Sequence, residues 1–251
     1  SSDLKKVFIS GSMSSTKLPL EVKNSINKII ENNFEILIGD ARGIDTLVQD
    51  YCLSLDYFHI IVYSIFKTPR YKASEHFQSK YIKVAHNITR ERIRQQEKDK
   101  AMTLDGEFTF TVWDGKSQGS YANIIRGLDN KKKVKVYLSS QKVFIKNITQ
   151  DKIEFIFREN NGYTALEVVQ YLKDHTEEMF QKTQDLNKYL MQKLVIQKNE
   201  DTYMPTNQYE NLFIINTYRG KASSIKFKNE FLVWIEKHIK ENRKSKQIHL
   251  F

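Results

Sequence analysis

One segment decides the fold of this chain, and it reads Thr111-Val112-Trp113-Asp114-Gly115-Lys116-Ser117-Gln118-Gly119-Ser120-Tyr121-Ala122-Asn123. Residues 108–113 alternate apolar and β-branched side chains, which predicts a strand, and Ile124, Ile125 and Leu128 are then spaced along one helix face. The glycine-containing turn between them leaves free backbone N–H groups and the positive end of the helix dipole at the helix start. The segment therefore predicts a phosphate-binding turn, and the alternative is an ordinary strand-to-helix connection.

Composition limits the classes of protein to which the chain can belong. Its 251 residues, 40% of them hydrophobic, suffice for one large domain or two ordinary domains with a buried core. No apolar run approaches the roughly 20 residues that span a membrane, and no signal-peptide pattern opens the sequence. The single Cys52 indicates a reducing, cytoplasmic compartment, and the six His residues form no zinc pattern. The formal net charge of +10 favours an acidic partner such as nucleic acid.

The first 140 residues alternate strand and helix patterns. This alternation predicts a Rossmann-like α/β fold, in which helices flank a parallel sheet with right-handed crossovers. The segment 67–89 is polar and has no period, and the charged helix after it is expected to pack through Ile93, Ala101 and Met102. Strands are expected at residues 6–9, 34–38, 59–66, 108–113 and 134–138, and helices at residues 19–30, 47–55, 90–104 and 124–128.

Three glycine-bearing turns follow predicted strands, at Gly11, at residues 39–43 and at residues 115–119. Ligands of open parallel sheets bind beyond the carboxyl ends of the strands, where these turns are expected to meet. Arg42 and Lys116 are candidates for pairing with phosphate oxygens, and the alternative is that they are solvated turn residues. The candidate ligand-binding residues are Gly11, Ser12, Gly39, Asp40, Arg42, Gly43, Asp45, Gly115, Lys116, Ser117, Gly119, Ser120 and Asn123.

The motifs at these turns resemble those of the SLOG superfamily. The resemblance covers residues 5–140, and the Trp-Asp-Gly-Lys-Ser-x-Gly motif is similar to that of the bacterial and phage branch related to DprA. It implies a Rossmann-like domain that binds nucleotides, nucleotide-derived signals or nucleic acid. The matching segments are Ile9-Ser10-Gly11-Ser12, Gly39-Asp40-Ala41-Arg42-Gly43-Ile44-Asp45, Asp99-Lys100-Ala101-Met102 and Trp113-Asp114-Gly115-Lys116-Ser117-Gln118-Gly119-Ser120.

Enzymatic members of that superfamily carry a glutamate that acts on the ribose C1′ where this sequence has Asn123. An amide can hydrogen-bond a ribose hydroxyl, but it is neither a carboxylate nucleophile nor a general base. The resemblance therefore favours binding over glycosidic-bond hydrolysis. Asp99 and Asp114 are the candidate catalytic carboxylates if the protein is an enzyme. The alternative is that Asp114 shapes its turn and Asp45 opens its helix.

The second half of the chain has a different pattern, and the turn at residues 159–162 is the expected boundary. The expected domains are residues 1–140 and residues 160–251. Residues 141–159 are expected to join them through two short strands, at residues 142–148 and 153–157.

Residues 160–251 are expected to form a winged helix–turn–helix. Thr164 begins the first helix, with Glu167 as its capping-box partner. The second helix is expected to carry Leu186, Leu190 and Leu194, and a strand pair and a last helix follow at residues 195–205 and 227–239. Three segments resemble the C-terminal, KilA-C-like domain of phage antirepressors, which implies DNA or protein binding. They are Tyr163-Thr164-Ala165-Leu166-Glu167-Val168, Leu186-Asn187-Lys188-Tyr189-Leu190 and Tyr203-Met204-Pro205-Thr206.

The second helix and the strand pair of this domain are expected to contact DNA phosphates and base edges. A solvated helix face, or a protein-docking module, is the alternative. The charge does not single out this domain, because residues 1–140 carry 22 Lys and Arg against 16 Asp and Glu, and residues 141–251 carry 18 against 14. The candidate DNA-binding residues are Lys182, Gln184, Asn187, Lys188, Gln192, Lys193 and Lys198.

The sequence thus predicts a bacterial or phage protein that couples a nucleotide-binding module to a DNA-binding winged helix. No other cofactor, no metal and no membrane partner is expected, and an oligomer is possible. Two alternatives stay open at this point. One is an enzyme that hydrolyses an N-glycosidic or phosphate bond of a nucleotide, and the other is an interaction protein without a small-molecule ligand.

Overall fold

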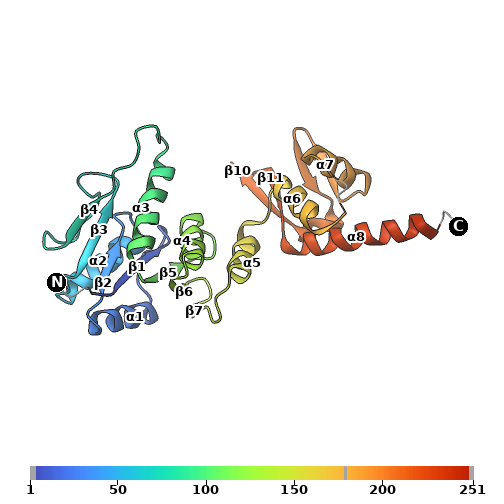
Figure 1. Ribbon diagram of the computed structural model, residues 1–251. Helices are drawn as coiled ribbons and strands as arrows, with labels where there is room; N and C mark the ends of the chain where they lie inside the picture. Colours follow the sequence, from blue (N-terminus) through green and yellow to red (C-terminus); the bar gives the residue numbers. More distant parts are fainter. Residues whose placement is uncertain (1–3, 178–179, 249–251) are drawn as a thin grey trace. The chain divides into compact units, whose positions relative to one another are not determined.

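The computed structural model describes residues 4–177 and 180–248 and divides the chain into two compact units, Ser1–Ile153 and Glu154–Phe251 (Figure 1). The division falls inside helix α5 (Gln150–Asn161). Each unit has a hydrophobic core of its own, so each is described by itself. Within the described residues, no helix has the length and apolar character needed to cross a membrane.

The first unit is built on a seven-stranded sheet in the order β4-β3-β2-β1-β5-β6-β7. All neighbouring strands are parallel except β6 and β7, which are antiparallel. The strand order reverses direction between β1 and β5, which confirms the predicted Rossmann-like α/β class. The strands are β1 (Lys6–Gly11), β2 (Glu35–Ile38), β3 (Ile60–Ser64), β4 (Gln78–Tyr81), β5 (Phe108–Trp113), β6 (Lys133–Leu138) and β7 (Val143–Phe144).

Four helices flank this sheet: α1 (Leu20–Glu31), α2 (Ile44–Ser54), α3 (Glu91–Asp105) and α4 (Gln118–Asp129). Side chains alternate between the two faces of a strand, so Val7 and Phe8 of β1 point to opposite faces. Val7 packs in the core that α1 and α2 complete, whereas Phe8 packs against Met102 of α3. Helices α3 and α4 lie side by side, as Figure 1 shows. The sheet is therefore covered on both faces, as its apolar strands require.

Two details of the first unit differ from the sequence prediction. Strand β4 lies within the segment 67–89, which has no periodic pattern, and all four of its residues are exposed at the edge of the sheet. Met102 is buried as predicted, but the side chain of Ile93 is 39% exposed. These two residues are nine positions apart, which at 100° per residue places them on opposite sides of the helix.

The second unit combines helices with two hairpins. Its core joins Val168 of α6, Leu186 and Leu190 of α7, and the aromatic residues Phe227 and Phe231. The predicted capping box is present, because the Glu167 amide donates to Thr164 Oγ1 at 3.2 Å and the Thr164 amide donates to Glu167 Oε2 at 2.8 Å. The elements are α6 (Ala165–His175), α7 (Thr183–Gln192), β8 (Ile196–Asn199), β9 (Thr202–Pro205), the 3-10 helix η1 (Asn207–Leu212), β10 (Phe213–Tyr218), β11 (Lys221–Phe227) and α8 (Asn229–Ile248).

Residues 153–157, predicted as a strand, lie in helix α5. Ile153 and Phe157 are buried one helical turn apart, whereas Phe155, which would share their face in a strand, is 52% exposed.

The sequence prediction also missed the hairpin β10–β11 and placed Phe227 in the last helix. Phe227 ends β11 instead, and α8 begins at Asn229. Leu194 was expected to be buried, but it lies beyond the end of α7, has a φ of 56° and is 73% exposed.

Leu186→Ala is expected to lower the free energy of unfolding by about 2–5 kcal/mol, because the leucine is fully buried and its loss leaves a cavity. Leu194→Ala is the matched control, and its effect should stay within about 0.5 kcal/mol because the side chain is exposed. Urea denaturation of the full chain measures both. Equal effects of the two substitutions would contradict this placement of the core.

Candidate functional site

A cavity of about 660 Å³ lies where the strand order of the first unit reverses. We call it the switch-point cavity. Ser10 and Gly11 of β1, the turn before α2, one face of α3 and the first turns of α4 line it. It therefore occupies the position in which parallel α/β sheets bind their ligands, beyond the carboxyl ends of the strands.

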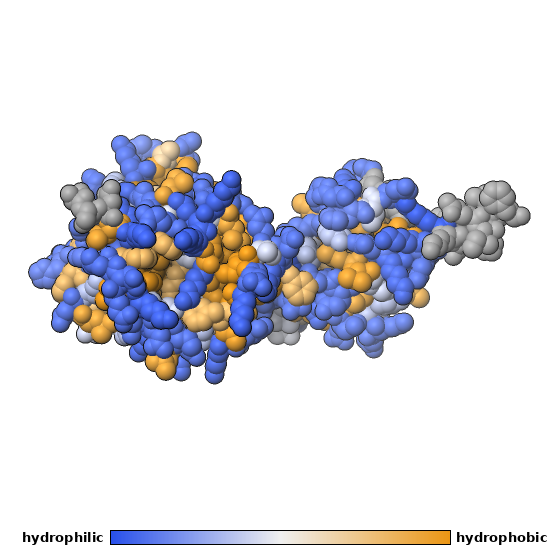
Figure 2. Space-filling model, turned by 60° about the horizontal axis from the view of Figure 1, so that its bottom comes forward, coloured by the Kyte–Doolittle hydropathy of each residue, from blue (hydrophilic) through white to orange (hydrophobic). Residues whose placement is uncertain are grey.

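A second cavity of the same unit, of about 260 Å³, lies at the opposite ends of the strands. Phe34, Phe108 and Phe110 line it. On the face of the first unit that Figure 2 shows, hydrophobic side chains gather in the middle. Lys135 covers this apolar surface, with its ammonium 5.7 Å from the ring centre of Phe110 and donating to Ser25 Oγ at 2.9 Å. This cavity lacks the turns and helix starts that make the switch-point cavity a candidate for an anionic ligand.

The switch-point cavity brings together about half of the predicted site residues. Those that line it are Gly11, Arg42, Asp45, Asp99, Ser117, Gly119, Ser120 and Asn123. Those that do not line it are Ser12, Gly39, Asp40, Gly43, Asp114, Gly115 and Lys116. The prediction missed a group of charged and polar lining residues, namely Arg70, Glu91, Arg92, Gln95, Gln96, Lys98 and Arg126.

Two helices begin at this cavity without a side-chain cap. Neither Gly43, the N-cap of α2, nor Ser117, the N-cap of α4, forms a side-chain capping hydrogen bond. Gln118, Gly119 and Ser120 of the first turn of α4 line the cavity. The first N–H groups of a helix need partners from outside the helix, and the helix dipole makes an anion a favourable one. The start of α4 therefore favours an anionic ligand, whereas the first turn of α2 contributes the carboxyl group of Asp45 to the lining.

Four arginines add positive charge to the lining. Arg70 is neutralised, because it forms ion pairs with Asp40 at 2.8 Å and with Glu91 at 3.5 Å. Arg42, Arg92 and Arg126 line the cavity too, and the described residues provide no ion pair for any of these three.

Arg126 is the most buried of these four arginines, since the other three are exposed. Its guanidinium donates to Asn123 Oδ1 at 2.7 Å, which is a neutral acceptor. Burial lowers the pKa of Arg126, against an opposing effect of Asp99 and Glu97. A guanidinium has five N–H donors in a planar fork that matches a phosphate or a carboxylate. An anion in the cavity would therefore stabilise the charge of Arg126.

A cluster of three charged side chains lies beside Gly39. Lys98 Nζ is 3.5 Å from Asp99 Oδ1, and the Ala41 amide donates to Asp45 Oδ2 at 3.2 Å. A Cβ atom on Gly39 would lie 2.3 Å from Asp45 Oδ2 and 2.7 Å from Lys98 Nζ. Gly39 is thus required to make room for the Asp45–Lys98–Asp99 cluster, and not for direct approach of a ligand.

Burial raises the pKa of Asp45 to about 6, although Lys98 and the Ala41 amide favour the ionised form. Because the unfolded carboxyl titrates near 3.8, the folded state loses stability as the pH rises from about 4 to about 6, and the loss then stays constant. Asp45→Asn should therefore raise the free energy of unfolding above pH 6 by about 3 kcal/mol and leave it almost unchanged near pH 4. Denaturation of both proteins at the two pH values measures this. A variant that is less stable than the parent at about pH 8 would show that the attraction of Lys98 outweighs burial.

Several predicted site residues outside the cavity hold its turns in place. Ser12 Oγ lies 3.0 Å from Ser117 Oγ and accepts the Asp114 amide at 3.1 Å, so it ties the turn after β1 to the turn after β5. Asp114 Oδ1 accepts the amides of Lys116 and Ser117 at 2.8 and 2.7 Å. Burial acts to raise the pKa of Asp114, but the two amides act more strongly in the other direction, so the net shift is downward. The carboxyl group is therefore held ionised in a structural role.

Asp40 and Gly43 also have structural roles. Asp40 is buried and accepts hydrogen bonds from Ser64 Oγ at 2.7 Å and from Arg70 Nη2 at 2.8 Å, so it positions Arg70 at the cavity. Gly43 has a φ of +84°, and a Cβ atom there would lie 2.5 Å from the carbonyl oxygen of Ser12. Only glycine fits where the turn before α2 crosses the turn after β1.

The strand order, the parallel pairing and the helices on both faces define the first unit as a Rossmann-like α/β domain. No protein-family model matches the sequence, and no curated protein does so. Among solved structures, a molybdenum cofactor binding protein from Rippkaea orientalis is similar at 10% identity and a TM-score of 0.42, over 76% of this chain and 98% of that chain. DprA from Streptococcus pneumoniae is similar at 15% identity and a TM-score of 0.38, over 74% of this chain and 61% of that chain.

The predicted DNA-binding residues all belong to the second unit. Lys182 is the N-cap of α7, and its amide donates to Asp185 at 3.0 Å. Asn187 is half-buried, whereas Lys193 lies directly after α7 with its ammonium 5.9 Å from the ring centre of Tyr189. The exposed residues of the set are Lys182, Gln184, Lys188, Gln192, Lys193 and Lys198.

Proposed function

We propose that the first unit binds a phosphate-bearing, nucleotide-type ligand in the switch-point cavity. One observation carries the proposal. The uncapped start of α4 lies at the same cavity as three arginines that lack an ion-pair partner among the described residues. Helix starts and arginine forks are the groups that bind phosphate most effectively in proteins.

The rest of the cavity lining supports a ligand with an apolar, planar part. Phe8 and Met102 form a buried apolar wall, and Met13 is 52% exposed at the same cavity. The volume of about 660 Å³ falls in the usual range for small-molecule sites, about 300–1,000 Å³. A nucleotide combines an anionic end with an aromatic base and fits such a lining.

Hydrolysis of the ligand is the second candidate function, and a specific observation favours it. Asp45 and Asp99 both line the cavity, and Lys98 forms an ion pair with Asp99, so carboxyl groups are present although Asn123 stands where the resembling enzymes have a glutamate. Asn123 itself accepts the Arg126 hydrogen bond and contributes no acid or base.

For the second unit we propose DNA binding through helix α7. Its exposed face presents Lys188 and Gln184, and Lys182 and Lys193 lie at its two ends. Lysines contact phosphates without sequence preference, whereas amide side chains read base edges. Buried Leu186 and Leu190 fix the opposite face of the helix in the core.

The proposed functions are separated by one experiment on the full chain. A thermal-shift screen of ribonucleotides and deoxyribonucleotides is run beside mass spectrometry of the same mixtures. Stabilisation without turnover supports a binding module, and turnover that Asp99→Asn abolishes supports a hydrolase. Stabilisation that Arg126→Gln removes places the ligand in the switch-point cavity. The absence of both stabilisation and turnover would refute a nucleotide site.

A further inference from the structure

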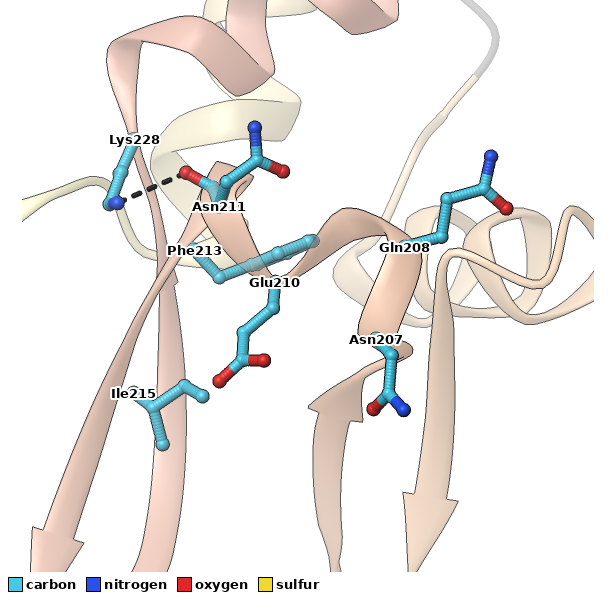
Figure 3. A pocket seen from close by; sticks show the side chains of 7 residues that line it. All are labelled: Asn207, Gln208, Glu210, Asn211, Phe213, Ile215 and Lys228. Carbon is cyan, nitrogen blue, oxygen red and sulfur yellow. Dashed lines mark hydrogen bonds between the residues drawn. The ribbon is translucent and has the colours of Figure 1, made fainter.

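Two hairpins of the second unit lie close together, because β9 and β11 are neighbours. Figure 3 shows both hairpins on the same side of one region: the strand that carries Ile215 runs away from it, and the strand that leads into Asn207 runs toward it. A shallow depression lies at their bases, lined by Asn207, Gln208, Glu210, Asn211, Phe213, Ile215 and Lys228. The hairpin β8–β9 follows α7 directly, which is the position of the wing that the sequence predicts.

The turn of the hairpin β8–β9 carries the wrong charge for a phosphate contact. Between Asn199 and Thr202 the chain reads Glu200-Asp201, and both carboxylate residues are exposed. Lys198 lies two residues before Glu200, so two negative charges follow its one positive charge within three residues. Carboxylates next to a phosphate chain are repelled, which opposes DNA binding by this turn.

The hairpin β10–β11 has the opposite character. Residues 213–227 contain three basic residues, Arg219, Lys221 and Lys226, and no acidic residue. The flanking carboxylates, Glu210 and Glu230, precede and follow the hairpin and so belong to its base. Arg219 and Lys221 lie at its tip and are exposed.

This hairpin is anchored at one end and free at the other. Phe213 and Phe227 are buried at its base, with ring centres 5.2 Å apart. All residues from Thr217 to Ser224 are exposed. Arg219 and Gly220 have φ angles of +50° and +77°. Two successive residues of positive φ are typical of the two-residue turn that joins the strands of a hairpin. The Arg219 guanidinium lies 5.3 Å from the ring centre of Tyr218, which is itself 65% exposed.

We propose that the β10–β11 hairpin, and not the β8–β9 turn, is the wing that contacts DNA. A two-stranded ribbon fits into the major groove of duplex DNA, and cationic side chains at its tip can then reach the phosphates beside the groove. Arg219 and Lys221 contact the DNA backbone, and Tyr218 packs against the sugars beside them. This inference rests on the proposed DNA binding of the second unit. It adds the β10–β11 hairpin to α7 as a second element that contacts the DNA.

The test compares three substitutions that each remove one positive charge: Arg219→Asn, Lys221→Gln and Lys198→Gln. Asparagine tolerates the positive φ of position 219, so the turn is kept. Binding of the full chain to a fluorescent duplex is measured by anisotropy at several salt concentrations. Each phosphate contact contributes about −0.9 to the slope of log K against log salt. Arg219→Asn and Lys221→Gln should each flatten the slope by about one unit, and Lys198→Gln should leave it unchanged.

Because the three variants carry the same net charge, a difference between them reports local contacts and not long-range attraction. Flattening by Lys198→Gln alone would overturn the inference and assign the wing to β8–β9. Salt-dependent binding that Lys188→Gln weakens but neither hairpin variant changes would overturn the inference and leave the role of α7 intact. Absence of salt-dependent binding by the unmodified protein would overturn the DNA-binding proposal itself, and the inference with it.

Discussion

Gly119→Val is expected to abolish nucleotide-induced stabilisation while the protein stays folded. Gly119 lies in the first turn of α4, lines the switch-point cavity, and a Cβ atom there would meet nothing within 4 Å. A valine side chain therefore adds volume only to the cavity, where it separates the ligand from the amides at the helix start. A ligand at about 100 times its Kd stabilises by about 2.7 kcal/mol, and that gain should disappear.

The measurement is a thermal-shift titration with the nucleotide that stabilises the parent protein most. The control is Lys116→Ala in the same turn, because Lys116 is exposed and does not line the cavity. This control should keep the full ligand-induced shift. Unchanged binding by a folded Gly119→Val protein would remove the start of α4 from the site, and loss of binding by Lys116→Ala would extend the site beyond the cavity.

DNA affinity of the full chain should fall steeply with salt. Lys188 of α7 and its flanking residues Lys182 and Lys193, together with Arg219 and Lys221 of the hairpin, give about five phosphate contacts and a log–log slope near −4.5. Affinity should then fall about 500-fold when the salt concentration rises fourfold. Fluorescence anisotropy with a duplex of mixed sequence measures the slope.

Single substitutions divide this effect among contacts of different kinds. Lys188→Gln should flatten the slope by about one unit and weaken all sequences alike, because a phosphate contact carries no sequence information. Gln184→Ala should change the preference among sequences instead, if its amide reaches a base edge. A slope near zero in the unmodified protein would make the second unit a protein-docking module.

The switch-point cavity shows how far sequence reasoning reached into the site. The glycine-bearing turns were found from the sequence because they interrupt a periodic pattern, and Gly11, Arg42 and Gly119 do line the cavity. Of the lining residues of α3, Asp99 was predicted and the others were missed. Glu91, Gln95, Lys98 and Met102 repeat at helical spacing, and this mixed stripe was the available signal; alone it does not distinguish a cavity wall from a solvated face.

The second unit was harder to predict because its local signals are weaker. The capping box of Thr164 and Glu167 is a local pattern and was found. The hairpin β10–β11 was missed, and its tip, with two residues of positive φ at Arg219-Gly220, is marked in the sequence by only one glycine. Within its strands only Phe213 and Phe227 are buried, so they lack the apolar alternation that reveals a half-buried strand.

The sequence by itself determined the α/β order of the first unit and the positions of its glycine-bearing turns, because periodicity and turn residues are local properties. Only the tertiary structure decided which residues share one cavity. It brought Arg126 and the Asp45–Lys98–Asp99 cluster to the carboxyl ends of β1 and β5, and it assigned Asp114 and Asp40 to holding the turns. The physical reason is that burial and charge pairing depend on neighbours distant in the sequence, which the packing of helices on the sheet selects.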